Sequence, residues 1–482
     1  MLRIIKYQLY LLQLENYEVF RYFRLIWKKG IFPPKEMRGE LVWTGKAKVI
    51  LILSLIIHLF GAKIVSLGVW YFTKNFWLSI IIYVLALVIL TFFHFIFHGI
   101  SVWILSPVHL YLKNRIVARA KIKIKSLSNL KIIGIAGSYG KTSMKEALRS
   151  ALSESFRVAS TPESVNTPIG IAKFIETEIN SQTQILIIEM GEHYRGDVAE
   201  ICKVARPDIG IITGINESHL ERLHDLKNSI ETVFELAQGI KESGILVLNA
   251  DDHNVRENYK SFTGDRKPFF YSSDNNPLCH FQTLDYHIST EELMSYFGIG
   301  EEGKNLGLIK SRILGEYIKG MAIAIMIISR KLNQPITKMI IGLEKLRPIP
   351  HRLEPIVNPN GLIVIDDSYN GNPEGVHEAI KLLSKFKDHR KVYLTPGLVE
   401  MGKKAEEVHI RIGEDLANSV DLVLLIRNSV TPYLEKGLMK NGFASSNIIW
   451  YDTAQEAHKS LDRILQKGDV IMFQNDWGDQ YV

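Results

Sequence analysis

The stretch that most constrains the fold is Ile132–Ser143, which reads IIGIAGSYGKTS. An apolar, β-branched run leads into a loop with two glycines, and a helix-like pattern starts at Met144. Glycines let backbone N–H groups approach phosphate oxygens, and a helix N-terminus adds the positive end of its dipole. The stretch therefore predicts a strand, a triphosphate-binding loop and a helix. Lys141 would reach the outer phosphates, and Thr142 would offer its hydroxyl to Mg²⁺.

The strict form of this loop has a glycine five positions before Gly140, where this chain has Ile135. Taken alone, the stretch is therefore also compatible with a tight strand-to-helix turn. Motifs further along the chain are needed to decide between the two interpretations.

The charge and cysteine content narrow the class of protein. The chain has 482 residues, enough for about three domains, and a net charge of +7. Its basic residues concentrate towards the N-terminal end, which favours a membrane surface over nucleic acid as the partner. Cys202 and Cys279 are far apart and form no C-x-x-C pair, so we expect reduced, buried thiols in a cytosolic compartment.

Two long apolar runs, 49–72 and 76–97, follow the basic N-terminal stretch, and the second contains no Asp, Glu, Lys or Arg. A helix needs about 20 residues to cross a bilayer core of about 30 Å. We therefore expect two transmembrane helices within a membrane-anchoring segment, 1–126. Lys63 would have to snorkel or mark a shifted boundary. The alternative is a buried helical hairpin of a soluble domain.

The flanks of the two runs predict the topology. Basic residues precede the first run and follow the second, whereas the connection between the runs offers only Lys74. By the positive-inside rule both flanks are cytoplasmic, so we expect a hairpin in the cell (inner) membrane. Everything from about residue 106 onward would then lie on the cytoplasmic side. Residues 9–23 could form an amphipathic helix on the membrane surface.

Beyond residue 130 short β-rich runs alternate with helical patterns, which indicates parallel α/β sheets with helices on both faces. Pro348 and Pro350 separate two such series. The predicted fold is a P-loop-type central parallel-sheet ATPase domain, 127–348, followed by a C-terminal Rossmann-like α/β domain, 349–482. The α-helical transmembrane hairpin precedes both. The expected strands are 131–136, 185–190, 209–213 and 245–249, then 362–366, 391–395, 421–426 and 469–473, with a less regular region at about 260–312.

Polar residues at the ends of three expected strands are candidates for chemistry. Glu189 ends the run ILIIE, at the strand tip where ligands of open α/β sheets bind, and could hold Mg²⁺. His219 lies just past another strand, although a lone histidine is more often structural. The run IVIDDSYNGNP at 363–373 suits ribose hydroxyls or a substrate, but also an ordinary Asx turn.

Together these pieces resemble the Mur ligase family, the ATP-dependent amide-forming ligases of cell-wall precursor synthesis. The resemblance covers about 127–482. It rests on the order and spacing of GSYGKTS at 137–143, VNTPIG at 165–170, IEMG at 188–191, ARPD at 205–208, SHLE at 218–221, LNADD at 248–252, Arg352, DDSYNGNP at 366–373 and GLVEMG at 397–402 with His409. The last two look most like the branch that adds D-alanyl-D-alanine to a UDP-muramoyl tripeptide.

The resemblance implies ATP and Mg²⁺ as cofactors, with a cell-wall precursor and a dipeptide or amino acid as substrates. A substrate carboxylate would be phosphorylated to an acyl phosphate, which an amine then attacks. Lys141, Glu189 and His219 would be catalytic, and Thr142, Glu189 and His219 would hold metal. The implied ATP-binding residues are Gly137, Ser138, Gly140, Lys141, Thr142, Ser143, Asn249, Arg352 and Asp367. The implied substrate contacts are Asn166, Ser368, Tyr369, Asn370, Asn372, Glu400 and His409.

Three departures from the family pattern keep alternatives open. Most of the family has in this place a lysine that is carbamylated in the active enzyme, whereas the segment Glu231–Glu235 has none. Glu231 or Glu235 would then have to supply the missing carboxylate charge. The family's G-x-H-N helix start reads Gly315-Glu316-Tyr317-Ile318, and its N-terminal sugar-binding domain is not recognisable. A ligase with another acceptor, or a membrane-bound nucleotide-binding scaffold without ligase activity, are therefore the alternative functions.

Overall fold

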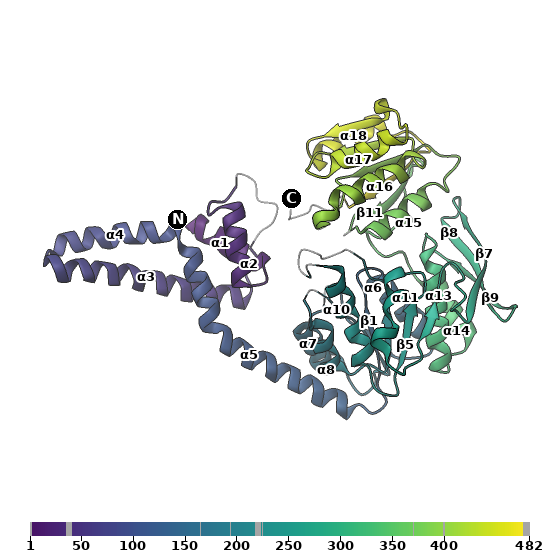
Figure 1. Ribbon diagram of the computed structural model, residues 1–482, viewed down its shortest axis with the longest axis horizontal. Helices are drawn as coiled ribbons and strands as arrows, with labels where there is room; N and C mark the ends of the chain where they lie inside the picture. The colour runs from purple at the N-terminus through teal and green to yellow at the C-terminus, as the bar shows by residue number, and fades with distance from the viewer. Residues whose placement is uncertain are drawn as a thin grey trace. The chain divides into compact units, whose positions relative to one another are not determined.

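The computed structural model describes residues 2–34, 41–163, 165–192, 194–216, 223, 225–369, 371–398 and 401–475. They divide into two compact units, Met1–Arg115 and Ile116–Val482 (Figure 1). The division falls inside the long helix α5 (His94–Ser126).

The N-terminal unit is helical, with α1 (Leu2–Leu14), α2 (Val19–Lys29), α3 (Gly45–Thr73), α4 (Phe76–Phe92) and the first part of α5. The amphipathic helix expected over 9–23 is divided between α1 and α2. Asn16 and Tyr17 have φ values of 51° and 66°, and the Tyr17 N–H donates to the Leu12 carbonyl. This left-handed backbone ends α1, as at many helix C-termini.

Helices α3 and α5 are long and apolar enough to cross a membrane, whereas α4 is a shorter apolar helix. α3 and α4 form a hairpin that turns at Lys74, and the Ser66 and Ser79 hydroxyls lie 2.8 Å apart between them. The second expected span, 76–97, is not one helix: the Phe93 N–H turns back to the Leu90 and Thr91 carbonyls, and α5 begins at His94. The 17 residues of α4 reach about 26 Å, somewhat less than a bilayer core.

The central domain contains a six-stranded parallel sheet in the order β2-β3-β1-β4-β5-β6. Its strands are β1 (Lys131–Ala136), β2 (Val158–Ser160), β3 (Ile185–Glu189), β4 (Ile209–Ile212), β5 (Ile245–Asn249) and β6 (Phe269–Tyr271). The four expected strands are therefore present. β1 lies between β3 and β4, with β2 and β3 on one side of it and the later strands β4, β5 and β6 on the other. The strand order therefore reverses at β1, which places a ligand crevice at its carboxyl end.

Helices cover both faces of this sheet, so its central strands are buried. One core gathers residues of α6 (Lys141–Leu152), α13 (Tyr317–Lys331) and α14 (Ile336–Lys345). The other gathers residues of α7 (Pro168–Glu178), α8 (Asp197–Ala205) and α10 (Leu226–Gly239). The short helices α11 (His253–Asn258) and α12 (Lys260–Thr263) follow β5.

The region expected to be less regular contains a three-stranded antiparallel sheet, β7 (Phe281–Ser289), β8 (Met294–Glu301) and β9 (Lys304–Ser311). Glu302 and Gly303 join β8 to β9 with φ values of 49° and 78°, as in a two-residue hairpin turn with both central residues left-handed. Phe297 and Ile309 of this sheet belong to the same buried core as residues of α13 and α14. The sheet lies beside these two helices (Figure 1).

The C-terminal domain contains a second six-stranded sheet, in the order β10-β11-β15-β12-β13-β14. Its strands are β10 (Glu354–Val357), β11 (Ile363–Asp367), β12 (Lys391–Thr395), β13 (Leu422–Ile426), β14 (Ile448–Tyr451) and β15 (Val470–Gln474), and only the β10–β11 pair is antiparallel. Its α-helices are α15 (Pro373–Leu383), α16 (Ala405–Ala417), α17 (Thr431–Lys440) and α18 (Ala454–Ile464), with short 3₁₀ turns at Gly402–Lys404 and Ser445–Asn447. This is the expected parallel α/β fold with one added antiparallel edge strand.

Helices α16 and α17 approach unusually closely because glycines face each other at their crossing. A Cβ atom added to Gly437 would lie 2.1 Å from the Ile410 carbonyl oxygen and 2.9 Å from the Gly413 Cα. Backbone atoms on both sides leave no room for a side chain, so the crossing depends on these two glycines.

We predict that Gly437→Ala destabilises the C-terminal domain by about 1–3 kcal/mol, because overpacking outweighs the gain of about 1 kcal/mol in helix propensity. Calorimetry of the full chain should show a lower unfolding midpoint. The neighbouring Lys436 side chain is exposed, and Lys436→Ala should change stability by no more than about 0.5 kcal/mol. Equal midpoints for the two variants would contradict the packing described here.

Candidate active site

The loop between β1 and α6 has the backbone expected of a phosphate-binding loop. Gly137 and Gly140 have φ values of 142° and 75°, and a Cβ atom at Gly137 would lie 2.3 Å from the Thr213 hydroxyl oxygen. Position 137 therefore requires glycine for both conformation and space. The segment that follows β4 also holds the loop, since the Ser138 N–H donates to the Gly214 carbonyl at 2.7 Å. The helix α6 begins at Lys141 and directs its N-terminus towards the loop.

Lys141 is held within the loop by a buried carboxylate that the sequence did not single out. Its Nζ lies 2.8 Å from Glu192 Oε1 and also donates to the Gly137 carbonyl. The Glu192 side chain is 2% exposed, and its second oxygen, Oε2, is buried without a hydrogen-bond partner among the described residues. A buried charge needs a partner, so Lys141 and Glu192 stabilise each other here.

Thr142 and Glu189 provide oxygen atoms suited to Mg²⁺. The Thr142 hydroxyl donates to Glu189 Oε2 at 3.1 Å, at the carboxyl end of β3. Lys145, whose side chain is 1% exposed, lies 3.3 Å from the same carboxylate oxygen. Hydroxyl and carboxylate oxygens are the donors that Mg²⁺ prefers, so the side chains present fit the predicted ion.

Two residues of the C-terminal domain reach towards this loop. Arg352 donates through Nη2 to the Thr142 hydroxyl at 3.5 Å, and its guanidinium lies 5.2 Å from the centre of the Tyr369 ring. Asp367 ends β11 and accepts the Leu353 N–H at 3.2 Å. Burial raises the pKa of Asp367 to about 7, although the Leu353 N–H and the Arg352 charge act in the opposite direction.

A cavity of about 170 Å³ joins these elements. It is lined by the loop and the start of α6, by the ends of β4 and β5, and by Arg352 and Asp367. Asn249, implied to bind ATP by the family resemblance, lines it and donates to the Thr213 carbonyl at 2.7 Å. Residues of the predicted loop, Asn249 and the two residues of the C-terminal domain therefore line one cavity. The predicted metal ligands Thr142 and Glu189 are not among its lining residues.

The predicted substrate residues divide into two groups. Tyr369 and Asn372 line the cavity, and Asn372 also caps α15 by accepting the Gly375 N–H at 3.0 Å. Ser368 and His409 form hydrogen bonds within the fold, and the Ser368 hydroxyl donates to Asp366 at 2.6 Å. The Asn166 backbone carbonyl accepts the Gly191 N–H at 2.9 Å, and a substrate contact through its side-chain amide stays a prediction.

His409 is fully buried, and both ring nitrogens bond to backbone. Nε2 accepts the Leu398 N–H at 2.8 Å, which leaves Nδ1 to donate to the Ala405 carbonyl at 2.6 Å. Burial lowers the pKa of this imidazole, consistent with its neutral form. Neither ring nitrogen is free for a substrate in this structure, so His409 shapes the loop that follows β12. The predicted residues His219, Asn370 and Glu400 lie outside the described residues.

The two candidates for the missing family carboxylate have other partners. Glu235 accepts the Gly196 and Ala199 N–H groups, both at 2.8 Å, and so caps α8. Burial raises the pKa of Glu235, and these two hydrogen bonds oppose the rise. Glu231 pairs with Arg195 at 2.7 Å. Glu192 is instead the buried carboxylate in contact with the loop, three residues after Glu189 in the sequence.

Comparisons with known proteins agree with this geometry. The family model described as "Mur ligase middle domain" matches residues 135–326, and that described as "Mur ligase, glutamate ligase domain" matches residues 351–474. The two matches lie on the two sheet domains, in order, and together cover more than half of the chain.

Individual relatives belong to one branch of that family. The chain is 27% identical over 361 residues to the UDP-N-acetylmuramoyl-tripeptide–D-alanyl-D-alanine ligase of Bacillus subtilis, covering 74% of this chain and 76% of that one. The Escherichia coli protein of the same name is 25% identical over 297 residues, covering 61% of this chain and 64% of its own length.

A solved structure shows the same fold. The MurF ligase of Thermotoga maritima, in complex with ADP, superposes with a TM-score of 0.65 and 25% identity, covering 75% of this chain and 80% of that one. The two family models, the relatives and this superposition agree, and the chain belongs to the Mur ligase family.

Proposed function

We propose that this chain is an ATP-dependent ligase that joins D-alanyl-D-alanine to a UDP-muramoyl peptide through an amide bond. The observation that carries the proposal is the single cavity at which the glycine loop, Asn249, Arg352 and Asp367 meet. The relatives that share both sheet domains are named for this reaction.

The proposed reaction has two steps. A carboxylate oxygen of the muramoyl peptide attacks the γ-phosphorus of ATP, the bond to the β,γ-bridging oxygen breaks, and ADP leaves. The amine of the dipeptide then attacks the acyl carbon. The tetrahedral intermediate collapses, phosphate leaves with the former carboxylate oxygen, and the nitrogen loses a proton. Excluding water matters, because water would hydrolyse the acyl phosphate.

Each proposed role follows from the position of the side chain. Lys141 and the amides at the start of α6 would stabilise charge on the β- and γ-phosphates. Thr142 and Glu189 would hold Mg²⁺, which when bound neutralises phosphate charge. Arg352 would approach the same phosphates from the C-terminal domain, and Asp367 would hold the nucleotide. His219 remains a proposed metal ligand.

Glu192 has a proposed role that the family pattern does not supply. It holds Lys141 through one oxygen, and its second oxygen has no hydrogen-bond partner among the described residues. An incoming phosphate would draw Lys141 away and leave a buried carboxylate beside the loop. We propose that Glu192, rather than Glu231 or Glu235, supplies the charge of the missing lysine carbamate.

We also propose that the N-terminal helices anchor the ligase to the cell (inner) membrane, with both sheet domains on the cytoplasmic side. The chain's partner would then be the cytoplasmic face of the membrane, with no nucleic acid. The α3–α4 hairpin, which turns at Lys74, supports this placement, because α3 is long and apolar enough to cross a membrane and α4 is a shorter apolar helix that would return the chain. The basic residues of α5 that follow its apolar part, among them Lys123 and Lys125, would lie at the cytoplasmic surface.

Lys141→Ala in the full chain tests the ligase. In detergent or nanodiscs, wild-type protein with ATP, UDP-muramoyl tripeptide and D-alanyl-D-alanine should release phosphate and form the pentapeptide product, detected by mass spectrometry. Lys141→Ala should lower turnover by about 10²–10³-fold, because a positioned cation is lost where charge develops. Lys203→Ala, an exposed lysine on α8, should leave it unchanged.

Other outcomes separate the alternatives. Product formed only with a different amine or peptide would support a Mur-type ligase with another acceptor. Nucleotide binding without any product would favour the membrane-bound scaffold and contradict the ligase.

The buried carboxyl of Asp367 predicts a pH dependence of stability. Its pKa is about 7 in the folded chain against 3.8 for the ordinary group, so the folded state binds more protons between those values. Stability should therefore fall as pH rises from about 4 to 7, by at most about 4 kcal/mol for this group. Asp367→Asn should reduce the drop in melting temperature between pH 5 and pH 8. The control Asp462→Asn, at an exposed position, should leave that drop unchanged. An unchanged drop in Asp367→Asn would contradict the assignment.

The anchor predicts how the protein fractionates. The chain should sediment with membranes even at high salt, because apolar helices insert by burial, whereas basic segments alone would be released as screening rises. Protease added outside sealed spheroplasts should reach only the connection near Thr73–Asn75. Cleavage of 127–482 from outside would contradict the topology and remove the active site from cytoplasmic ATP.

A further inference from the structure

The segment that carries Arg352 has an unusual backbone. His351 and Leu353, on either side of Arg352, have φ values of 61° and 46°. Left-handed backbone is disfavoured for residues with a Cβ atom, and most of all for bulky ones. Such strain persists only where surrounding contacts enforce it, and it gathers at functional sites. The contacts around this turn therefore show what holds Arg352 in place.

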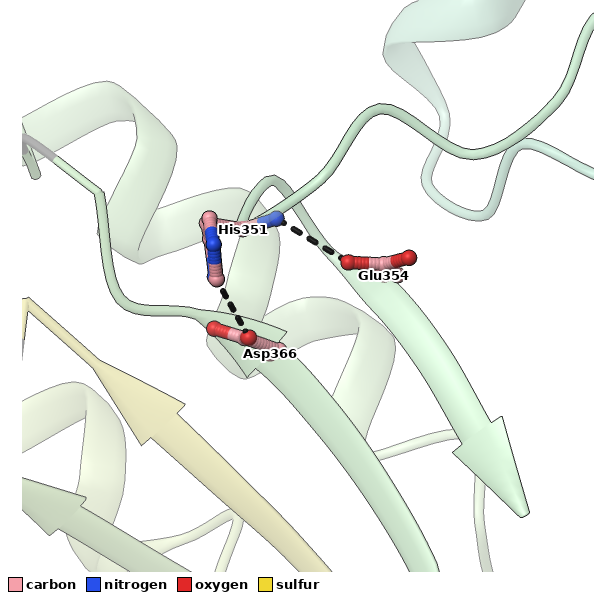
Figure 2. A group of neighbouring side chains, drawn as sticks. All are labelled: His351, Glu354 and Asp366. Carbon is pink, nitrogen blue, oxygen red and sulfur yellow. Dashed lines mark hydrogen bonds and ion pairs between the residues drawn. The ribbon is translucent and has the colours of Figure 1, made fainter.

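Three carboxylates hold the turn, two of them at His351 and one at Leu353. His351 Nδ1 lies 2.8 Å from Asp366 Oδ2, and Glu354 Oε2 accepts the His351 N–H at 3.1 Å (Figure 2). Asp367 accepts the Leu353 N–H at 3.2 Å. The two neighbouring aspartates at the end of β11 thus grip the residues before and after Arg352.

Asp366 is itself fixed, so it provides a firm support. Its other oxygen, Oδ1, accepts the Ser368 N–H at 3.0 Å and the Ser368 hydroxyl at 2.6 Å. Tyr369, over which the Arg352 guanidinium lies, donates its own N–H to the His351 carbonyl at 3.3 Å. A displacement of His351 would therefore disturb both the backbone of Arg352 and the ring beneath it.

The same three side chains could also be considered as a metal site, since ligand atoms of His351, Glu354 and Asp366 lie within 4.8 Å of one another. In the structure, however, these groups hold one another: the imidazole Nδ1 bonds to Asp366, and Glu354 binds backbone (Figure 2). The hydrogen bonds favour a clamp, and metal binding is an outcome that the test below distinguishes.

We propose that His351 is a positioning residue that, with Asp366 and Glu354, clamps the left-handed turn presenting Arg352 to the phosphate loop. The inference rests on the proposed function for the role of Arg352. In this proposal His351 touches neither nucleotide nor substrate. It affects the reaction by fixing the backbone segment that leads into β10 and carries Arg352.

The test uses the full chain with His351→Gly, His351→Asn, Arg352→Ala and the double variant His351→Gly/Arg352→Ala. Glycine accepts the left-handed backbone but lacks the imidazole, so His351→Gly should lower kcat on the order of tenfold or more, with a smaller change in the KM for ATP. Asparagine tolerates this backbone and offers a donor to Asp366, and should restore part of the rate.

The double variant separates positioning from general stability. If His351 acts through Arg352, the double variant should be no slower than Arg352→Ala alone. Additive losses would overturn the proposal, as would a wild-type kcat in His351→Gly. The matched control is His377→Gly, which removes an exposed pair with Asp415 at 3.2 Å on α15 and α16 and should leave kcat unchanged.

Hydrogen exchange tests the clamp independently of catalysis. The amides at 351 and 353 should exchange faster in His351→Gly than in wild type, even if no substrate pair supports ligation. Inactive wild-type protein with this exchange pattern would overturn the proposed function and retain the clamp. Unchanged exchange would overturn the clamp. Stoichiometric zinc or manganese in purified wild type, absent from His351→Gly, would show a metal site and also overturn it.

Discussion

The pairing of buried charges beneath the glycine loop is the constraint on which the rest of the site depends. Lys141 lies 2.8 Å from Glu192, and Lys145 lies 3.3 Å from Glu189, with all four side chains largely buried. Burying one of these ions alone would cost several kcal/mol, so the strands and helices that carry them must stay in register. Each buried charge at the loop is thus paired with an opposite one. A triphosphate with its metal ion would bind by replacing these carboxylate and lysine partners.

The two sheet domains supply different charged residues to the site. The central domain supplies the paired charges at the end of β1 and β3, where a parallel sheet opens its ligand crevice. The C-terminal domain supplies Arg352 and Asp367 from the start of β10 and the end of β11. A cation that arrives from a second domain can be withdrawn, which suits an enzyme that must admit three substrates and then exclude water.

The sequence predicted the strands that a continuous run of apolar residues marks. Central parallel strands are buried on both faces and read as continuous apolar runs, so β1, β5 and β12 lie at their expected residues. The edge strands β2, β6 and β14 have only three or four residues and are only partly buried, and none was predicted. The break at Phe93 was missed because the apolar run continues through it without proline or glycine.

In the candidate site, too, the sequence predicted residues that a local motif marks and missed those that meet only in the folded chain. Lys141, Thr142 and Glu189 were found because a loop motif and a strand tip mark them. The Lys141–Glu192 and His351–Asp366 pairs depend on side chains meeting in space, and no motif marks Glu192 or His351. His409 belongs to a family motif, yet both of its ring nitrogens form hydrogen bonds to backbone groups. The sequence alone does not show these bonds.

The central claim is that the carboxylate of a muramoyl peptide attacks ATP directly. Labelling that carboxylate with ¹⁸O and examining the released phosphate by ³¹P NMR tests this step most directly. The account predicts one ¹⁸O atom in each phosphate formed during ligation by the full chain, because the carboxylate oxygen leaves with the phosphoryl group. Unlabelled phosphate, formed at the same rate with or without the peptide, would show that water attacks ATP and would contradict the ligase.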